Sequence, residues 1–116
     1  MKQIPLCNLE MLHGLWENVE VPIIVHFESP QANVCKKSRS AFTQVAEINA
    51  RRDALFLNMA ATTDAEILKI FEEFGFLRFP AILIYDYGEI RHRFDSLQSV
   101  MKELEIRVKK ALTPER

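Results

Sequence analysis

The side chains best suited to chemistry in this sequence are two cysteines, Cys7 and Cys35, and three histidines. Thiol–disulfide exchange needs an exposed thiolate of low pKa to attack, and a second thiol nearby to resolve the mixed disulfide. Cys7 lies near the N-terminus while Cys35 opens a long amphipathic stretch, and a disulfide requires Cα atoms within about 7 Å, so we expect no bridge. Two unpaired cysteines, with no secretory segment before the first helix-like stretch, predict a reducing, cytoplasmic location.

Cys35 is open to more than one interpretation. It shares one stripe of a predicted helix with Ser38, Phe42 and Val45, so the first interpretation is a thiol that points into the core as a small, inert hydrophobe with a raised pKa. The alternative is a single-thiol nucleophile, activated by the helix dipole and by the two lysines that follow it. A third interpretation is a site of regulatory oxidation.

The histidines favour a structural role over metal binding. His26 is a lone imidazole within an apolar run, which indicates a hydrogen-bonded, neutral core residue and not a base or a ligand. His13 and His92 fall in other predicted elements, and no Cys/His pair has the spacing of metal ligands. Iron–sulfur sharing between two chains needs an exposed cysteine and a glutathione site, and the sequence indicates neither. We therefore predict no metal and no cofactor.

Length and composition narrow the class of protein. The chain has 116 residues, of which 48% are hydrophobic and 27% charged, with a formal net charge of −1. These values are typical of one compact soluble domain, so residues 1–116 are predicted to form a single domain. No apolar run reaches the roughly 18 residues of a membrane span, and there is no basic excess for phosphate backbones. We expect neither a membrane nor a nucleic-acid partner.

Short basic patches occur at Lys36–Arg39 and Arg91–Arg93. Such patches usually form solvated surface, and the basic alternation of the second is typical of an edge strand that resists edge-to-edge pairing. We interpret both as solvated surface and neither as a nucleic-acid footprint.

Buried strands are predicted where apolar, β-branched residues run almost without interruption. These runs are Val21–Phe27, Ala54–Met59 and Ala81–Tyr85. The alternating residues Ile90–Phe94 predict a further strand, which forms an antiparallel hairpin with the preceding one through a turn at Gly88. A short additional strand is predicted at Lys2–Leu6.

Helices are predicted between these strands by apolar residues at steps of three and four. They cover Leu9–Trp16 after an Asn8 cap, the stretch from Cys35 to Ile48, Thr63 to Gly75, and Leu97–Leu112. Thr63 and Glu66 form a capping-box pattern, and Gly75 stands where a left-handed cap ends a helix. The order β-α-β-α-β-α-β-β-α predicts a mixed sheet with helices on both faces, which is a three-layer α/β/α sandwich.

Three landmarks in this frame resemble the thioredoxin superfamily over nearly the whole chain. The stretch Ile23–Lys36 is a buried strand, a loop and a helix start, where the family places Trp-Cys-x-x-Cys-Lys. Phe79-Pro80 precedes the strand Ala81–Tyr85, where the family has a cis-proline that faces the active-site loop. The Asp86–Glu89 hairpin is the third landmark. The resemblance implies the thioredoxin-like fold.

The same resemblance implies that the redox site is incomplete. It places Ala32 at the first cysteine of the family motif and Cys35 at the second, so the attacking thiol is missing. Family members use a buried acid on the central strand and a lysine on the next strand to move protons, and these positions are assigned to His26 and Phe56. The chain is therefore similar to redox-inactive branches of the superfamily.

Two such branches share particular residues with this chain. Phosducin-like proteins have a similar Val-His-Phe strand with a damaged motif, and the thioredoxin-like domains of monothiol glutaredoxins keep Ala-x-x-Cys, as Ala32 to Cys35 does here. In the family, the proline loop and the active-site segment hold an extended peptide through backbone hydrogen bonds. The resemblance implies a partner-binding surface at Gln31, Ala32, Asn33, Phe79, Pro80, Phe94 and Asp95.

Together these observations predict a redox-inactive module that binds a protein or extended peptide partner. The alternative is an enzyme, a single-cysteine thiol–disulfide oxidoreductase that uses Cys35 and an external thiol as resolver.

Overall fold

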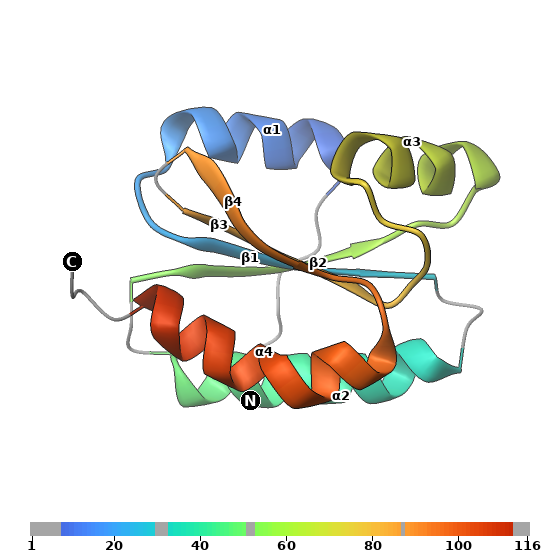
Figure 1. Cartoon of the computed structure of the whole chain (residues 1–116). Coiled ribbons are helices and arrows are strands. Elements are labelled where there is room, and N and C mark those ends of the chain that lie inside the picture. The colour runs from blue at the N-terminus through green and yellow to red at the C-terminus, as the bar shows by residue number, and fades with distance from the viewer. Residues whose placement is uncertain (1–7, 30–32, 51–52, 87, 113–116) are drawn as a thin grey trace.

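Eight helices and strands make up the part of the chain that the computed structural model describes, namely residues 8–29, 33–50, 53–86 and 88–112 (Figure 1). In chain order they are α1 (Leu9–Asn18), β1 (Ile23–Glu28), α2 (Val34–Ile48), β2 (Leu55–Ala60), α3 (Asp64–Phe74), β3 (Ala81–Asp86), β4 (Glu89–Phe94) and α4 (Leu97–Leu112). From α1 onward this is the predicted order. The strand predicted at residues 2–6 lies outside the described residues.

The strands form one mixed sheet in the order β2-β1-β3-β4. β1 pairs in parallel with β2 and antiparallel with β3, and β4 pairs antiparallel with β3 in the predicted hairpin. All six residues of β1 are buried, because β1 lies inside the sheet and helices cover both of its faces. The mixed sheet is confirmed.

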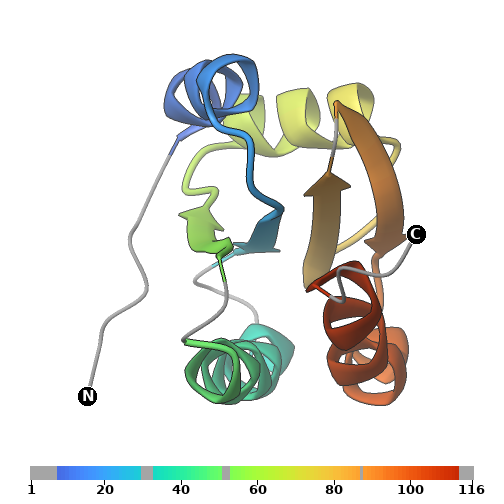
Figure 2. The same cartoon turned by 90° about the vertical axis from the view of Figure 1, so that its left-hand side faces the viewer.

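Two pairs of helices enclose the sheet. Figure 1 shows α1 and α3 above it and α2 and α4 below, and Figure 2 shows the same layers along the strands. On the upper face Leu12, Ile70 and Phe74 pack against alternate residues of the strands. On the lower face the packing residues come from α2 and α4 and include Phe42, Val100 and Leu104. The predicted three-layer sandwich is confirmed.

The predicted helix ends are present as hydrogen bonds. Asn8 accepts from the backbone N–H of Met11 at 2.9 Å, and Thr63 and Glu66 form a complete capping box. Gly75 ends α3 with a φ of 75°, a left-handed conformation that suits glycine. The Nη1 of Arg93 donates to the carbonyl oxygen of Phe74 at 2.8 Å. Arg93, predicted to be simply solvated, therefore binds the end of α3.

One boundary differs from the prediction in a way that affects the site. The sequence predicted a strand at Val21–Phe27, whereas β1 begins at Ile23 and continues to Glu28. Glu28 pairs with Ala60 of β2, and its carbonyl oxygen accepts from the N–H of Ala61 at 2.8 Å. The residue is only 4% exposed. An acidic residue would normally end a buried strand, so its carboxylate must be compensated within the fold.

Candidate functional site

The sheet brings the predicted partner-binding residues to one end of the molecule. β1 and β2 are parallel, so their carboxyl ends lie together, and β3 begins at this same end because Phe27 pairs with Ala81. β4 ends there too, since Phe94 pairs with Ile82. The loop after β1, the segment before β3 and the segment after β4 thus meet. We call this end of the sheet, with Asn33, Val34, Leu77, Phe79 and Asp95, the loop edge.

The predicted residues differ in how much surface they offer. Asn33 is exposed, Phe79 and Asp95 are half-buried, and Pro80 is buried after a cis peptide bond from Phe79. Phe79 lies 5.0 Å from Phe71 between ring centroids, so part of its ring supports α3. Gln31 and Ala32 lie outside the described residues. Asn33 and Phe79 therefore offer more contact surface than the buried Pro80.

Phe94 and Asp95 have structural roles as well. Phe94 is half-buried and packs against the cluster between the sheet and α2 and α4. The carboxylate of Asp95 accepts from the backbone N–H of Leu77 at 2.9 Å. This bond fixes the segment before β3 against the end of β4.

Leu77 is a residue of the loop edge that sequence reasoning missed. Its side chain is 77% exposed, although it is a large apolar residue. Val34, the first residue of α2, is 43% exposed. Both residues lie at the end of the sheet where the loops meet, so their exposed apolar side chains are available to a partner at the loop edge. The available signal was an apolar residue in the short connection between Gly75 and Pro80, where no helical or strand period explains it.

Cys35 lies below this edge and is closed off from solvent. Its exposed fraction is 0%. Burial raises the pKa of the Cys35 thiol, and the negative charge of Glu28 acts in the same direction. A hydrogen bond from the backbone of Ser29 and the charge of Arg39 lower this pKa but do not reverse the shift. The predicted core position of Cys35 is confirmed.

Glu28 and Arg39 form the charged part of a polar cluster beside Cys35. The Nε of Arg39 donates to Oε1 of Glu28 at 2.7 Å, and Nη2 donates to Oε2 at 2.8 Å. This two-bond geometry is the strongest arrangement for an arginine and a carboxylate. The Glu28 side chain is 5% exposed and that of Arg39 is 44% exposed. Arg39, predicted to belong to a solvated basic patch, instead neutralises a buried acid.

His26 completes the cluster, as a buried imidazole with partners on both nitrogens. Nδ1 lies 2.7 Å from Oδ1 of Asn58, and Nε2 lies 2.6 Å from Oγ of Ser38. An amide oxygen can only accept, so Nδ1 carries the proton and the neutral ring accepts from the Ser38 hydroxyl at Nε2. Burial is the main cause that lowers the His26 pKa. The prediction of a neutral, hydrogen-bonded core histidine is confirmed.

The strand register gives His26 a partner on β2 that the sequence did not predict. It pairs His26 with Asn58 and Phe56 with Ile24, while the assignment of Phe56 to the family's lysine position rests on the resemblance and stays a prediction. Phe56 lies against Phe42, with ring centroids 5.9 Å apart. A two-residue shift preserves the side of the strand, so alternation alone does not distinguish these positions. The side chain of β2 that contacts His26 is therefore the neutral amide of Asn58.

The Ser38 hydroxyl connects His26 to the backbone of Cys35. Its hydrogen has two acceptors within reach, Nε2 of His26 at 2.6 Å and the carbonyl oxygen of Cys35 at 3.1 Å. If His26 takes up a proton, Nε2 becomes a donor and the hydroxyl hydrogen turns to the Cys35 carbonyl. The cluster can thus accept one proton by reorienting a single hydroxyl.

The buried imidazole makes stability dependent on pH. Because the His26 pKa is lowered in the folded chain from the ordinary 6.5, the unfolded chain binds more protons between the two values. We expect full stability above pH 6.5, and a loss of up to about 1.4 kcal/mol per pH unit as pH falls below it. Urea unfolding at pH 7.5, 6.5 and 5.5 measures this slope.

The control compares two histidines in the same measurement. His26→Gln should flatten the slope, whereas His92→Gln should remove only a smaller part, because His26 is fully buried and His92 is half-buried. An identical slope for wild type and His26→Gln would contradict this assignment.

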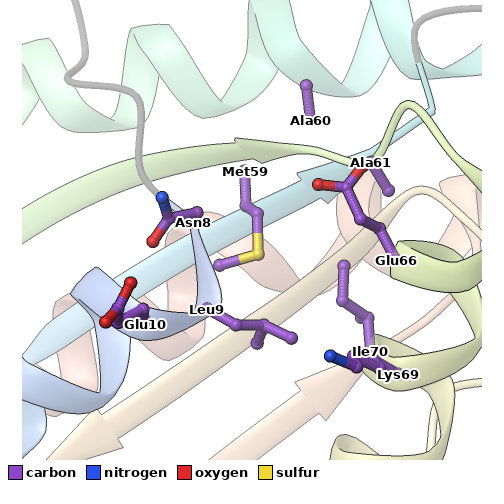
Figure 3. Close-up of a pocket in the computed structure, with 9 residues that line it drawn as sticks. All are labelled: Asn8, Leu9, Glu10, Met59, Ala60, Ala61, Glu66, Lys69 and Ile70. Atoms are coloured by element: carbon purple, nitrogen blue, oxygen red, sulfur yellow. The ribbon is translucent and has the colours of Figure 1, made fainter.

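A cavity of about 220 Å³ opens beside the loop edge, between α1, the end of β2 and α3 (Figure 3). Its floor includes Met59 and Ile70. Two of its polar side chains already serve helix ends, since Asn8 caps α1 and Glu66 accepts from the backbone N–H groups of Thr62 and Thr63. This lining is accounted for by the starts of two helices.

The described residues contain neither a metal-binding cluster nor a membrane-spanning helix. In residues 8–29, 33–50, 53–86 and 88–112, no three His, Cys, Asp or Glu side chains are placed to hold a metal ion. Across the same ranges no helix has the length and apolarity needed to cross a membrane. The proposed absence of a Cys7–Cys35 bridge involves a residue outside these ranges and stays a prediction.

Comparisons with known proteins agree with this architecture. No family model matches the sequence, and no curated protein matches it. Among solved structures, thioredoxin f from spinach chloroplast has a TM-score of 0.79 at 14% identity, covering 96% of this chain and 88% of that one. The thioredoxin of Malassezia sympodialis has a TM-score of 0.77 at 11% identity, with coverages of 97% and 94%. Thioredoxin f2 of Chlamydomonas reinhardtii has a TM-score of 0.76 at 10% identity, with coverages of 97% and 100%. At such low sequence identity, similarity to solved structures shows the fold alone. This chain has the thioredoxin fold.

Proposed function

We propose that this chain is a redox-inactive thioredoxin-fold module that binds an extended segment of a protein partner at the loop edge. The observation that carries the proposal is the complete burial of Cys35, the sulfur that the sequence retains at the motif. A thiol with no exposed surface and a raised pKa is a poor nucleophile. The sequence position of Ala32, where the family has its attacking thiol, supports the same conclusion.

The loop edge has the features that an extended peptide needs. Leu77 and Val34 expose apolar side chains, and Asn33 is exposed and makes no side-chain bond to the first turn of α2. Apolar anchors with free polar groups beside them are typical of grooves that hold peptides by backbone pairing and side-chain pockets. The proposal includes an adaptor role of the phosducin-like or monothiol-glutaredoxin-domain kind, in the cytoplasm. The strand Val25-His26-Phe27 supports the first of these likenesses.

Replacing Leu77 with aspartate tests the docking surface. We expect Leu77→Asp to lower capture of the partner from native extract at least about tenfold, because a charge cannot enter an apolar contact at the centre of an interface. Capture on immobilised protein with peptide identification measures this. Ile106→Asp is the matched control, since Ile106 is 61% exposed in the second half of α4, about three helical turns beyond the loop-edge residue Asp95.

The result has two readings that differ clearly. Proteins lost with Leu77→Asp but retained with Ile106→Asp support docking at the loop edge. Equal capture by wild type and Leu77→Asp would place any partner elsewhere and overturn the proposal.

The competing function is a single-cysteine oxidoreductase. Two observations favour it, namely the position of Cys35 in the first turn of α2 and the hydrogen bond from Ser29 to its sulfur, which lowers the thiol pKa. Burial nevertheless raises the Cys35 pKa, against the effect of the hydrogen bond from Ser29. The accessibility and turnover measurements described in the Discussion separate the two functions.

A further inference from the structure

A second cavity lies at the opposite end of the sheet from the loop edge. It has a volume of about 380 Å³ and is lined by Asp86, Arg91, His92, Lys110 and Ala111. These residues belong to the end of β3, the start of β4 and the last turn of α4, which lie toward the left of Figure 1. Basic residues separated by about twenty positions in the sequence therefore converge on one hollow.

A β-bulge is the local reason for this convergence. His92 pairs with Ile84, whereas Ile90 pairs with Tyr85, so Arg91 is an extra residue in β4. Successive residues of a regular strand point to opposite faces of the sheet. Here the irregularity allows Arg91 and His92, which are neighbours in sequence, to line the same cavity. Bulges often occur where a side chain is redirected toward a site.

The charges around His92 are predominantly positive. Arg91 on its own strand and Arg107 and Lys110 on α4 act on it, against one carboxylate on α4, that of Glu103. Burial first, and then Arg107 and Lys110, lower the His92 pKa. Asp86, the acidic member of the lining, is only 4% exposed and has interactions of its own. The lining thus combines the basic residues Arg91, His92 and Lys110 with one carboxylate that is largely shielded from solvent.

Two of these arginines have only weak partners. Nη1 of Arg91 lies 3.5 Å from Glu89, whose side chain is 68% exposed, and Nε of Arg107 lies 3.0 Å from Glu103 one helical turn away. Exposed pairs of this kind contribute little and exchange readily for a better partner. Arg91 and Arg107 therefore remain able to bind an anion that carries more charge than a carboxylate.

We propose that this cavity binds a dianionic phosphate group through Arg91, His92 and Lys110. An arginine offers a planar fork that matches phosphate oxygens, a lysine offers a compact point charge, and an imidazole adds an N–H donor. The volume exceeds that of a phosphate alone, so there is room for part of the group that carries it. The site is separate from the loop edge and does not depend on the proposed docking function.

The test follows the ring protons of His92 by NMR in the full chain while inorganic phosphate is added at pH 7.5. We expect a saturable shift with phosphate and none with chloride at the same ionic strength. Bound phosphate should also raise the His92 pKa, because it adds negative charge beside the ring. Lys110→Gln should weaken phosphate binding about tenfold, the scale of losing one charge-assisted hydrogen bond.

Two further arms complete the experiment. Lys69→Gln removes the same charge from α3 on the other face of the sheet and should leave phosphate affinity within about twofold of wild type, the spread expected when a distant charge is removed. If a phosphoserine peptide binds more tightly than inorganic phosphate, the natural ligand is a phosphorylated protein. If the two bind equally, the natural ligand is the free anion. No saturable shift, an equal shift with chloride, or unchanged affinity in Lys110→Gln would each overturn the proposal. Arg91→Gln, an exposed site, serves if Lys110→Gln does not fold.

Discussion

Cys35 in the folded chain is expected to react with iodoacetamide at least about a thousandfold more slowly than in the chain unfolded by urea. The side chain has no exposed surface, so reaction requires an opening of the structure, and burial raises the thiol pKa further. A core opening that costs about 4 kcal/mol or more leaves roughly one molecule in a thousand reactive. Mass spectrometry of alkylation at pH 7, in a Cys7→Ser background, measures the rate.

A neighbouring position provides the matched control. Val34 precedes Cys35 and is 43% exposed, so Val34→Cys in a chain lacking both native cysteines should react at a rate close to that of the unfolded protein. The two thiols share the same helix start and differ mainly in exposure. If Cys35 reacts within about tenfold of the Val34→Cys thiol, a gap too small for a core opening, Cys35 is accessible and the redox-inactive proposal fails.

Turnover gives the companion readout. Insulin reduction with glutathione or with thioredoxin reductase should remain at the uncatalysed rate for wild type and for Cys35→Ser alike. Turnover by wild type that disappears in Cys35→Ser would instead identify a single-cysteine oxidoreductase, which needs only an external thiol to resolve the mixed disulfide.

Arg39→Gln is expected to destabilise the fold by about 2 to 4 kcal/mol. The substitution leaves the Glu28 carboxylate, 5% exposed, without the two hydrogen bonds that neutralise it. The value lies at or below the usual cost of breaking a buried pair, because the Arg39 side chain is 44% exposed and water reaches part of the pair. Urea unfolding at pH 7.5 measures the change.

Two comparisons show whether burial is the cause. Arg107→Gln breaks a pair with Glu103 on α4, in which the two side chains are 35% and 39% exposed. It should cost about 0.5 kcal/mol or less. The double variant Glu28→Gln/Arg39→Gln should be more stable than Arg39→Gln, since it removes the unpaired charge. Equal losses for Arg39→Gln and Arg107→Gln would contradict the buried-pair interpretation.

The single variant Arg39→Gln should also alter the titration of His26. Glu28 raises the His26 pKa and Arg39 lowers it, and Nδ1 of His26 lies 3.6 Å from Oε1 of Glu28. Removal of Arg39 therefore favours the protonated imidazole, and the loss of stability below pH 6.5 should become shallower. Glu28, Arg39 and His26 thus act as one unit beside Cys35.

Local features of the sequence predicted much of the fold. The Asn8 cap, the capping box at Thr63 and the left-handed Gly75 each involve residues within a few positions of one another, and all are present. Such signals are readable because their energies arise within one or two turns of the chain. The position of Cys35 in the core also followed from a helical stripe, which is a local pattern.

Features that depend on pairing between distant segments were not predictable in the same way. The pairing of His26 with Asn58 could not be predicted from alternation, which identifies a face of a strand and not its register. The pairing of the buried Glu28 with Arg39, the exposure of Leu77 and the bulge at Arg91 arise only when helices and strands pack. Glu28, Arg39 and Arg91 are of types that, taken alone, are typical of ordinary surface, whereas Leu77 is of a type typical of the core.

The sequence by itself determined which segments become helices and strands, how they end, and that alanine occupies position 32, because these depend on residue type and short-range spacing. The tertiary structure alone decided that a network of His26, Ser38 and Asn58 reaches the backbone of Cys35, and that basic residues from β4 and α4 line one cavity. The physical reason is that solvent exposure and charge proximity are set by strand register and layer packing, which bring together residues far apart in the chain.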